Sequence, residues 1–577
     1  MTSVGATSGP HHPSPPSKAR LMMSNALNQD AENGPVMAAD GTPLKRSLAR
    51  ALRRQKGRAL LLIAPLLIFV LVTFIVPIGS MLFRSVENDI VANTLPDTVQ
   101  RLASWDATSG ELPAEGVYEA MYYDLFVAAE AKRHTRLGSR LNYEESGISS
   151  LFRQSGRKID DLAKDATKAL ESAVPAFKDG ETWYALMNAG NDEANSGLLS
   201  AMRGRIGRLN DSSASGEMDF APSALMADIL PLTTRSYTEW AVYEATEEGR
   251  DPATRDPWEL VPLALLQELK TADLSGLTGT RAELLTQAQA VNFDIPPYSE
   301  VLADIDPEWG TILPWETIQT HSSKYTAGYF LNAVDAQKTP EGYAWQPEDK
   351  QILLKLFGRT LIMSMIITCS CILLGYPVAW LLANLPTAKA NLLMILVLLP
   401  FWTSLLVRTS AWKVMLQQQG VINDVLVWLG LVDDANRLIM INNQFGTIVA
   451  MTHILLPFMI LPMYSVMQTV PPSYLRAAKS LGATNWTAFW RVYFPQSIPG
   501  IGAGSILVFI LSIGYYITPE IVGGTKGVFI SNRIAYHISS SLNWGLAAAL
   551  GSILLAVVLL LYWCYDRIVG IDNVKLG

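Results

Sequence analysis

Long stretches without charged side chains alternate with polar segments along this chain of 577 residues. A helix needs about 20 mainly apolar residues to cross the hydrocarbon core of a bilayer. Six stretches without Lys, Arg, Asp or Glu approach or exceed that length: 59–83, 360–388, 390–407, 438–475, 492–519 and 534–565. We therefore predict an all-α integral membrane protein with six transmembrane helices.

A polar block, residues 84–356, separates the first two predicted spans and is long enough to form a domain of its own. Apolar residues recur in it at helical spacing, whereas the alternation typical of strands is scarce. The clearest helical patterns cover residues 118–136, 159–174, 223–230, 257–270 and 281–291. We expect a mainly helical insertion, which acts either as a docking surface or substrate vestibule or as a decorated loop without a specific task.

Charge is distributed unevenly between these parts. Residues 84–356 carry 24 Lys and Arg against 43 Asp and Glu, whereas both flanking parts are net basic. Cations crowd just before the first span: Lys45, Arg46, Arg50, Arg53, Arg54, Lys56 and Arg58. Because positive charge favours the cytoplasmic side, both termini are expected in the cytoplasm and the insertion in the periplasm.

The expected domain organisation has four parts. Residues 1–57 form a disordered basic cytoplasmic tail, and 58–83 form the first transmembrane helix. Residues 84–356 form the periplasmic insertion, and 357–577 form a five-helix core that contains the cytoplasmic loop 471–500. A retained first helix is favoured over a cleaved signal peptide, because a long polar segment precedes it and no convincing cleavage site follows.

The loop 471–500 has a chemistry that differs from the spans around it. Pro471 and Pro472 end the preceding helix, since proline lacks an amide donor. Ser473 is a plausible N-cap for a short helix through Leu481, and Gly482 suits the left-handed position that follows a helix. The simplest interpretation is an amphipathic pair of helices that merely connects two spans.

A second short helix is expected after this first one. Thr484 or Asn485 caps its start, and Pro495 limits its length. The small side chains of Ala477 and Ala478 in the first helix permit close approach by a partner.

The loop resembles the EAA loop of ABC importer permeases, written EAA-x3-G-x9-I-x-LP. Four residues match this pattern: Ala477, Ala478, Gly482 and Pro495. Val492 and Phe494 stand at the Ile and Leu positions, and Arg476 replaces the Glu. In that family the helix docks in a groove of the ATPase subunit. The ATPase-coupling residues implied by the resemblance are Tyr474, Leu475, Arg476, Ala477, Ala478, Lys479, Leu481, Gly482 and Ala483.

Two further segments resemble the spermidine/putrescine-type branch of these permeases. Residues 399–412 (LPFWTSLLVRTSAW) look like its PFWTS-x(3)-R segment. Residues 515–520 (YYITPE) with Gly523-Gly524 resemble the segment after its fifth span. Roughly half the chain is covered, and the insertion and the tail are not part of the usual pattern.

This resemblance implies a permease subunit of the bacterial inner membrane that transports a small organic cation such as putrescine or spermidine. The implied partners are an ABC ATPase dimer, a second permease subunit and a periplasmic substrate-binding protein. No phosphate-binding GxxxxGK[ST] pattern occurs in the sequence. We therefore expect no catalytic residue, metal or cofactor in this chain, with ATP and Mg on the partner ATPase.

Candidate residues of the translocation path lie near the predicted outer ends of the third and fifth spans. They are Phe401, Trp402, Thr403, Arg408, Tyr515, Tyr516 and Glu520. Glu520 could attract a cation, and aromatic rings can hold one by its charge. The alternatives are interfacial anchoring for the charged pair and an ordinary aromatic belt for the rings.

Two other classes of function are weighed against a permease. An ion-coupled secondary transporter is expected to carry ionisable residues inside its spans, and here His453 is the one such residue well inside. We expect His453 to be a neutral, hydrogen-bonded packing residue. A membrane receptor with a ligand-sensing ectodomain is expected to carry a cytoplasmic signalling domain, which neither terminus resembles.

Overall fold

The computed structural model describes residues 44–569, which divide between two units, residues 1–80 and 81–577. Helix α2 (Leu44–Val70) lies in the first unit and leads into a π turn (Leu71–Ile75), and α3 (Val76–Arg84) follows and ends in the second unit. The π turn lies just before Pro77, whose missing N–H removes one bond of a regular helix.

Helix α2 corrects the expected boundary of the tail at residue 57. It begins at Leu44 because residues 44–58 are rich in Leu, Ala, Arg and Lys, which favour helix. The expected tail residues 1–43 lie outside the described residues.

Five helices in residues 44–569 are long and apolar enough to cross a membrane. They are Leu52–Arg84, Leu353–Asn384, Gln444–Gln468, Asn485–Gly514 and Trp544–Arg567. The expected third span is not one straight helix, because Thr387–Trp402 and Leu405–Met415 meet at 93°. Pro400 lies in the short 3₁₀ turn before the break, where it cannot continue the helical hydrogen bonds. The chain has six spans if this bent pair is one span, so the count of six stays a prediction.

The expected last span, 534–565, also contains a break. Helix α29 (Ile530–Ser539) ends before α30 (Trp544–Val569) begins, and Leu542 between them has a left-handed backbone, with φ +55°. A non-glycine residue in this conformation is uncommon and interrupts a helix, although the apolar sequence continues.

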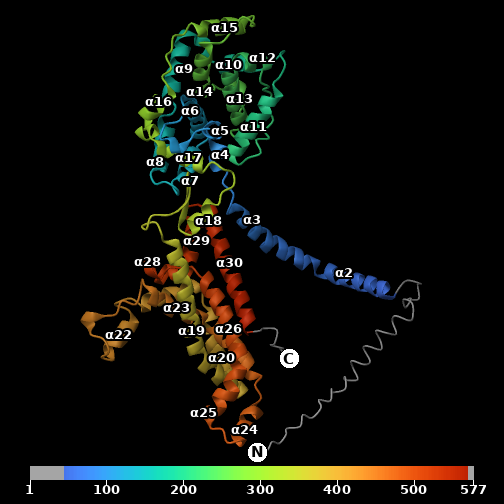
Figure 1. Cartoon of the computed structure of the whole chain (residues 1–577), viewed down its shortest axis with the longest axis vertical. Helices are drawn as coiled ribbons and strands as arrows, with labels where there is room; N and C mark the ends of the chain where they lie inside the picture. Colours follow the sequence, from blue (N-terminus) through green and yellow to red (C-terminus); the bar gives the residue numbers. More distant parts are fainter. Residues whose placement is uncertain (1–43, 570–577) are drawn as a thin grey trace, which may run out of the picture. The chain divides into compact units, whose positions relative to one another are not determined.

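The insertion, residues 84–356, is called the insert domain from here on and is almost entirely helical (Figure 1). Its helices are α4 (Ile90–Thr94), α5 (Pro96–Leu102), α6 (Glu115–Glu130), α7 (His134–Leu141), α8 (Ile148–Lys158), α9 (Asp161–Ala173), α10 (Gly180–Met187), α11 (Ser196–Asn210), α12 (Ala224–Ile229), α13 (Pro231–Thr246), α14 (Leu260–Leu269), α15 (Thr280–Gln289), α16 (Tyr298–Ile305), α17 (Ile312–Thr320) and α18 (Gly328–Ala333). A hairpin of β1 (Ala336–Thr339) and β2 (Gly342–Trp345) follows, with Ala336 opposite Trp345.

Each of the five helical patterns expected in the insertion contains a helix. The pattern over 118–136 covers the end of α6 and the start of α7, which are separated at Lys132 with φ +57°. One large apolar cluster, with Trp183, Trp240, Trp309 and Trp315 fully buried, forms the core of the domain.

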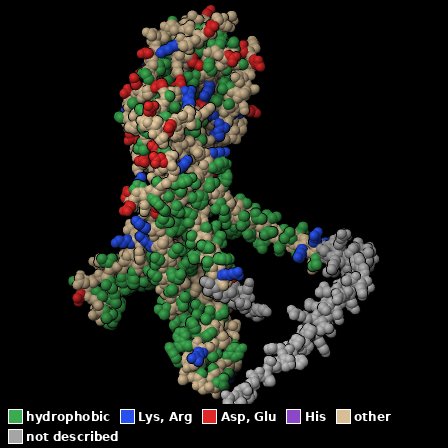
Figure 2. Space-filling view, viewed as in Figure 1, with side chains coloured by type: hydrophobic (Ala, Val, Ile, Leu, Met, Phe, Trp, Pro, Cys, Tyr) green, Lys and Arg blue, Asp and Glu red, His purple; other side chains and the backbone are tan. Residues whose placement is uncertain are grey.

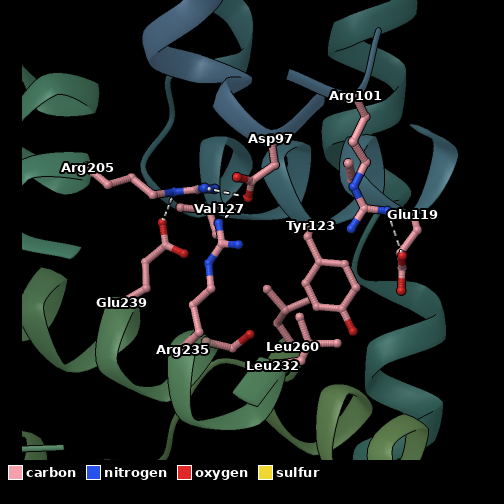
Figure 3. Close-up of a pocket in the computed structure, with 12 residues that line it drawn as sticks. Asp97, Arg101, Glu119, Tyr123, Val127, Arg205, Leu232, Arg235, Glu239 and Leu260 are labelled. Atoms are coloured by element: carbon pink, nitrogen blue, oxygen red, sulfur yellow. Dashed lines mark hydrogen bonds and ion pairs between the residues drawn. The ribbon is translucent and has the colours of Figure 1, made fainter. Parts of the chain in front are cut away.

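A buried ionic cluster joins four helices of the insert domain, α5, α6, α11 and α13 (Figure 3). Arg205 of α11 contacts Asp97 at 2.9 Å, Asp124 at 2.8 Å and Glu239 at 2.5 Å. Burial would raise the pKa of Asp97, but Arg205 and Arg235 together lower it below its usual range. The adjoining cavity has a volume of about 50 Å³, which is room for a few water molecules rather than for an organic solute.

The helical core comprises α19 (Leu353–Asn384), α20 (Thr387–Leu398), α21 (Leu405–Met415), α22 (Val421–Trp428), α23 (Gln444–Gln468), α24 (Pro472–Ser480), α25 (Asn485–Ala488), a π turn (Phe489–Tyr493), α26 (Phe494–Gly514), α27 (Ile517–Val522), α28 (Gly524–Gly527), α29 and α30. Helix α23 packs against both α19 and α26 through a cluster rich in methionine. Figure 2 shows mainly hydrophobic side chains over these helices, and acidic and basic side chains over the insert domain. This distribution fits a core with an apolar environment.

Replacement of Arg205 tests the ionic cluster. Arg205→Ala leaves several carboxylates buried without their counter-ion, so it should lower the free energy of unfolding of the insert domain by about 3–5 kcal/mol. The measurement is thermal unfolding of the purified full chain, followed by tryptophan fluorescence. Arg153→Ala is the control, since Arg153 is exposed. Equal melting temperatures for the two variants would contradict a structural role for the cluster.

Candidate functional site

Helix α24 is a short, exposed helix between α23 and α25. It begins directly after Pro471, which stands at the N-cap position without a side-chain hydrogen bond, so Ser473 is not the N-cap that the sequence predicts. Proline in the first turn is tolerated because its missing N–H has no partner there in any helix. The start of α24 is therefore fixed by the Pro471-Pro472 pair.

The left-handed position that the sequence predicts at Gly482 is part of a Schellman motif at the end of α24. The backbone N–H of Ala483 donates to the Ala478 carbonyl at 3.0 Å, and that of Gly482 donates to the Lys479 carbonyl at 3.0 Å. Gly482 has φ +88°, which glycine adopts without the steric cost of a side chain. These bonds define how the chain leaves the helix.

One side of α24 attaches it to the helical core. Leu475 is partly buried against the core cluster, together with Phe489 and Val470. The rings of Phe489 and Tyr493 stack with their centroids 5.9 Å apart, in the π turn at the start of α26. A displacement of α24 would therefore press on that turn.

The second helix after Gly482 starts as predicted but does not end as predicted. The Thr484 side chain accepts a hydrogen bond from the Thr487 N–H at 3.2 Å and caps α25. The expected limit at Pro495 is wrong, because residues 485–514 form one continuous helical span through the π turn. Pro495 lies in the first turn of α26, where its ring is accommodated.

The remaining residues expected to couple to an ATPase lie on the exposed part of this loop. Tyr474 is 52% exposed and Leu481 is 89% exposed. Arg476, Ala477 and Lys479 are also exposed, and Ala478 is partly so.

The aromatic residues expected at the third span lie at its break. The ring of Phe401 packs edge-on against Phe458 of α23, with centroids 4.9 Å apart. Trp402 is 73% exposed, and the Thr403 hydroxyl donates to the Pro400 carbonyl at 2.9 Å. Thr403 therefore closes the turn, while Trp402 faces away from the core.

Arg408 lies on α21 within electrostatic range of His453 and Tyr515. Its Nε atom is enclosed and has no hydrogen-bond partner among the described residues. His453 is exposed and accepts a hydrogen bond at Nδ1 from the Trp412 indole N–H at 3.1 Å, so it is hydrogen-bonded as expected, while its neutral packing role stays a prediction. Buried Thr409 meets Thr518 at 3.2 Å and fixes α21 against α27.

The residues after the fifth span are organised by a buried asparagine. The Asn532 side-chain amide donates to the Glu520 carboxylate at 2.6 Å and to the Tyr516 carbonyl at 2.9 Å. Its carbonyl oxygen accepts from the Phe529 N–H at 2.9 Å. Glu520 is exposed but held in place, and within the described residues no ion pair joins it to Arg408.

The glycine-rich segment 523–527 packs closely against the start of α23. A Cβ on Gly527 would lie 2.6 Å from the Thr447 hydroxyl oxygen and 2.7 Å from the Asn443 carbonyl oxygen. The Thr447 hydroxyl donates to the Gly527 carbonyl at 3.1 Å. A Cβ on Gly523, one of the two glycines matched to the resemblance, would lie 2.5 Å from the same hydroxyl oxygen, so Gly523 and Gly527 both allow a contact that larger residues would prevent.

The structure adds Trp412, Thr409, Thr518 and Asn532 to the residues expected near the outer ends. Each acts through a partner on another helix, and the sequence carries no local pattern that reveals such pairs. Within residues 44–569, no group of His, Cys, Asp and Glu is placed to hold a metal ion.

A single methyl group at position 527 tests the glycine contact. Gly527→Ala should lower stability by about 1–3 kcal/mol, because the added Cβ clashes with neighbouring backbone. Gly514→Ala is the matched control, since a Cβ there meets nothing within 4 Å. Thermal unfolding in detergent should separate the two variants, and an unchanged melting temperature for Gly527→Ala would refute the close contact.

Comparison with known proteins places the helical core in a family. Residues 358–570 match the profile of the binding-protein-dependent transport system inner membrane component. The spermidine/putrescine transport system permease protein PotB of Salmonella typhimurium (strain SL1344) is 36% identical over 215 residues, covering 37% of this chain and 74% of that protein. PotB of Escherichia coli (strain K12) is also 36% identical, covering 37% of this chain and 78% of that protein.

A solved structure of a bacterial alginate ABC transporter, in complex with an alginate-bound periplasmic protein, has 18% identity and a TM-score of 0.31, and covers 37% of this chain and 77% of that chain. The match to the family lies in the helical core, and these relatives are transport components rather than enzymes. The chain belongs to the inner membrane permease family of binding-protein-dependent ABC transport systems.

Proposed function

We propose that this chain is the permease subunit of an ATP-driven importer, in which it forms part of the path for a small organic cation, most simply a polyamine such as putrescine or spermidine. The observation that carries the coupling part is α24, an exposed helix fixed at both ends and attached to the core on one side. The solute class rests on the 36% identity to spermidine/putrescine permeases over 215 residues.

The charge distribution supports a membrane orientation for this permease. The N- and C-termini and the loop 471–500 lie in the cytoplasm of a bacterial inner membrane, and residues 84–356 lie in the periplasm. The partners are an ABC ATPase dimer that holds ATP and Mg, a second permease subunit and a periplasmic substrate-binding protein. The acidic insert domain is a docking surface or vestibule on the periplasmic side.

Coupling follows from how α24 is built. When the two ATPase subunits close on bound ATP, each draws its docked helix with it. The contact of α24 with the π turn transmits this motion to α26, because the helix from residue 485 to 514 is continuous. Alternating access then results from a tilt of α26 and α23 together.

The solute path is proposed to open at the outer ends of the bent pair and of α26. Glu520 offers an exposed carboxylate whose position Asn532 fixes at 2.6 Å. Tyr515, Tyr516, Phe401 and Trp402 supply rings that can hold an ammonium group.

Alanine at position 482 tests the coupling. Gly482→Ala places a side chain in a left-handed conformation, which costs about 1–2 kcal/mol and loosens the end of α24. In proteoliposomes containing the complex, solute-stimulated ATP hydrolysis and uptake should fall several-fold. Gly358→Ala is the control, because its Cβ would meet nothing and its φ lies outside the left-handed region. Full coupling in the Gly482→Ala complex would contradict the proposed role of α24.

A competition assay tests the solute and the path. Putrescine and spermidine should compete for uptake, whereas an anion such as sulfate should not.

Glu520→Gln keeps the hydrogen bond with Asn532 but removes the charge, and should raise the KM for putrescine about five-fold, equivalent to about 1 kcal/mol. Glu348→Gln, another exposed carboxylate, should leave the KM unchanged. If both variants have the same KM, the proposal that Glu520 contacts the solute is wrong.

A further inference from the structure

The exposed side of α24 has a defined composition. Leu475 faces the core. Because an α-helix has about 3.6 residues per turn, the position of Leu475 determines which residues lie on the opposite side of α24. Ser473, Ala477 and Ser480 occupy that outward side, and all three are exposed. Small side chains along the outward side let the backbone of a partner approach closely.

One edge of this small-residue face is apolar. Tyr474 is 52% exposed and Leu481 is 89% exposed, and they lie seven residues, or about two helical turns, apart. Trp486 of α25, 72% exposed, extends the apolar surface beyond Gly482. Large apolar side chains gathered on an exposed surface mark a contact with another molecule.

The other edge of the face is cationic. Arg476 lies in the row of Ser473 and Ser480, and its carbonyl accepts the Ser480 hydroxyl at 3.0 Å. Its guanidinium is exposed, and no ion pair within residues 44–569 involves it. The sequence has no Asp or Glu between Asp434 and Glu520, so the loop itself offers Arg476 no counter-ion.

Membrane orientation alone would require only positive charge somewhere in the loop, which Lys479 and Arg491 also supply. Lys479 lies in the row of Leu475, the side on which α24 meets the core, whereas Arg476 borders the outward face, and both side chains are exposed. The placement of Arg476 therefore bears on a partner rather than on orientation.

We propose that the ATPase groove that receives α24 has two unlike walls. One wall carries an apolar pocket for Leu481 and Tyr474, and the other carries a carboxylate that pairs with Arg476. A guanidinium and a carboxylate form a two-pronged, charge-assisted pair, which fixes the orientation of the helix in its groove. This inference rests on the proposed function, since it specifies the partner surface of the same helix.

The test uses the complete complex, purified from native membranes through a tag on the permease. Arg476→Glu is informative because it rebuilds the residue usual in the EAA pattern while reversing the charge. If the groove has an acidic wall, the permease with Arg476→Glu should co-purify with at most about one tenth of the ATPase that the unchanged permease retains. The purification is carried out at about 150 mM salt, close to physiological ionic strength. Arg476→Gln should give an intermediate loss.

Lys389→Glu is the matched control, because it makes the same charge change at an exposed position on the same predicted side of the membrane. It should retain the ATPase fully. Loss of ATPase in both variants to the same extent would overturn the acidic wall in favour of general charge attraction. If the permease with Arg476→Glu retains as much ATPase as the unchanged complex, or more, the acidic wall is also overturned. The proposed function then still stands.

A different result separates the two proposals. If the unchanged chain retains no ATPase, the proposed function itself fails. Correct folding of the Arg476 variants is checked by their melting temperature in detergent, which should equal that of the unchanged chain because Arg476 is exposed.

Discussion

The helical core depends on how closely α23 approaches the helices on either side of it. A Cβ on Gly504 of α26 would lie 2.7 Å from the Met459 sulfur, and one on Gly375 of α19 would lie 3.0 Å from the Met463 methyl carbon. Among helices surrounded by lipid, burial from water gives no driving force, so association relies on close contact between backbones. Small residues facing flexible methionines supply that contact.

This packing determines what the two ends of the core can do. The C-terminal end of α23 leads into α24, and α26 begins just after it, so the loop is held by two helices that are already fixed to each other. At the opposite end, the start of α23 is locked to the glycine segment 523–527 through Thr447. A force on α24 therefore acts on a unit whose other end carries Glu520 and Tyr515.

The sequence predicts features that depend on local chemistry. Apolar length locates the spans, and the conformational freedom of glycine predicts the left-handed turn at Gly482. The break after Pro400 and the one near Leu542 interrupt stretches whose composition does not change, so counting apolar residues cannot detect them. Arg205 and its carboxylates, or Trp412 and His453, are far apart in sequence and meet only through the fold. Such pairs are invisible to periodicity because either residue alone is an ordinary choice for its helix.

The central claim is that the outward face of α24 contacts an ATPase subunit. A photo-reactive amino acid at Leu481, the most exposed of its large side chains, tests this in native membranes without purification. We expect cross-linking to an ATPase subunit, with a yield that changes when ATP is bound. Cross-linking to lipid alone, or an ATPase-free product in membranes that support uptake, would contradict the account.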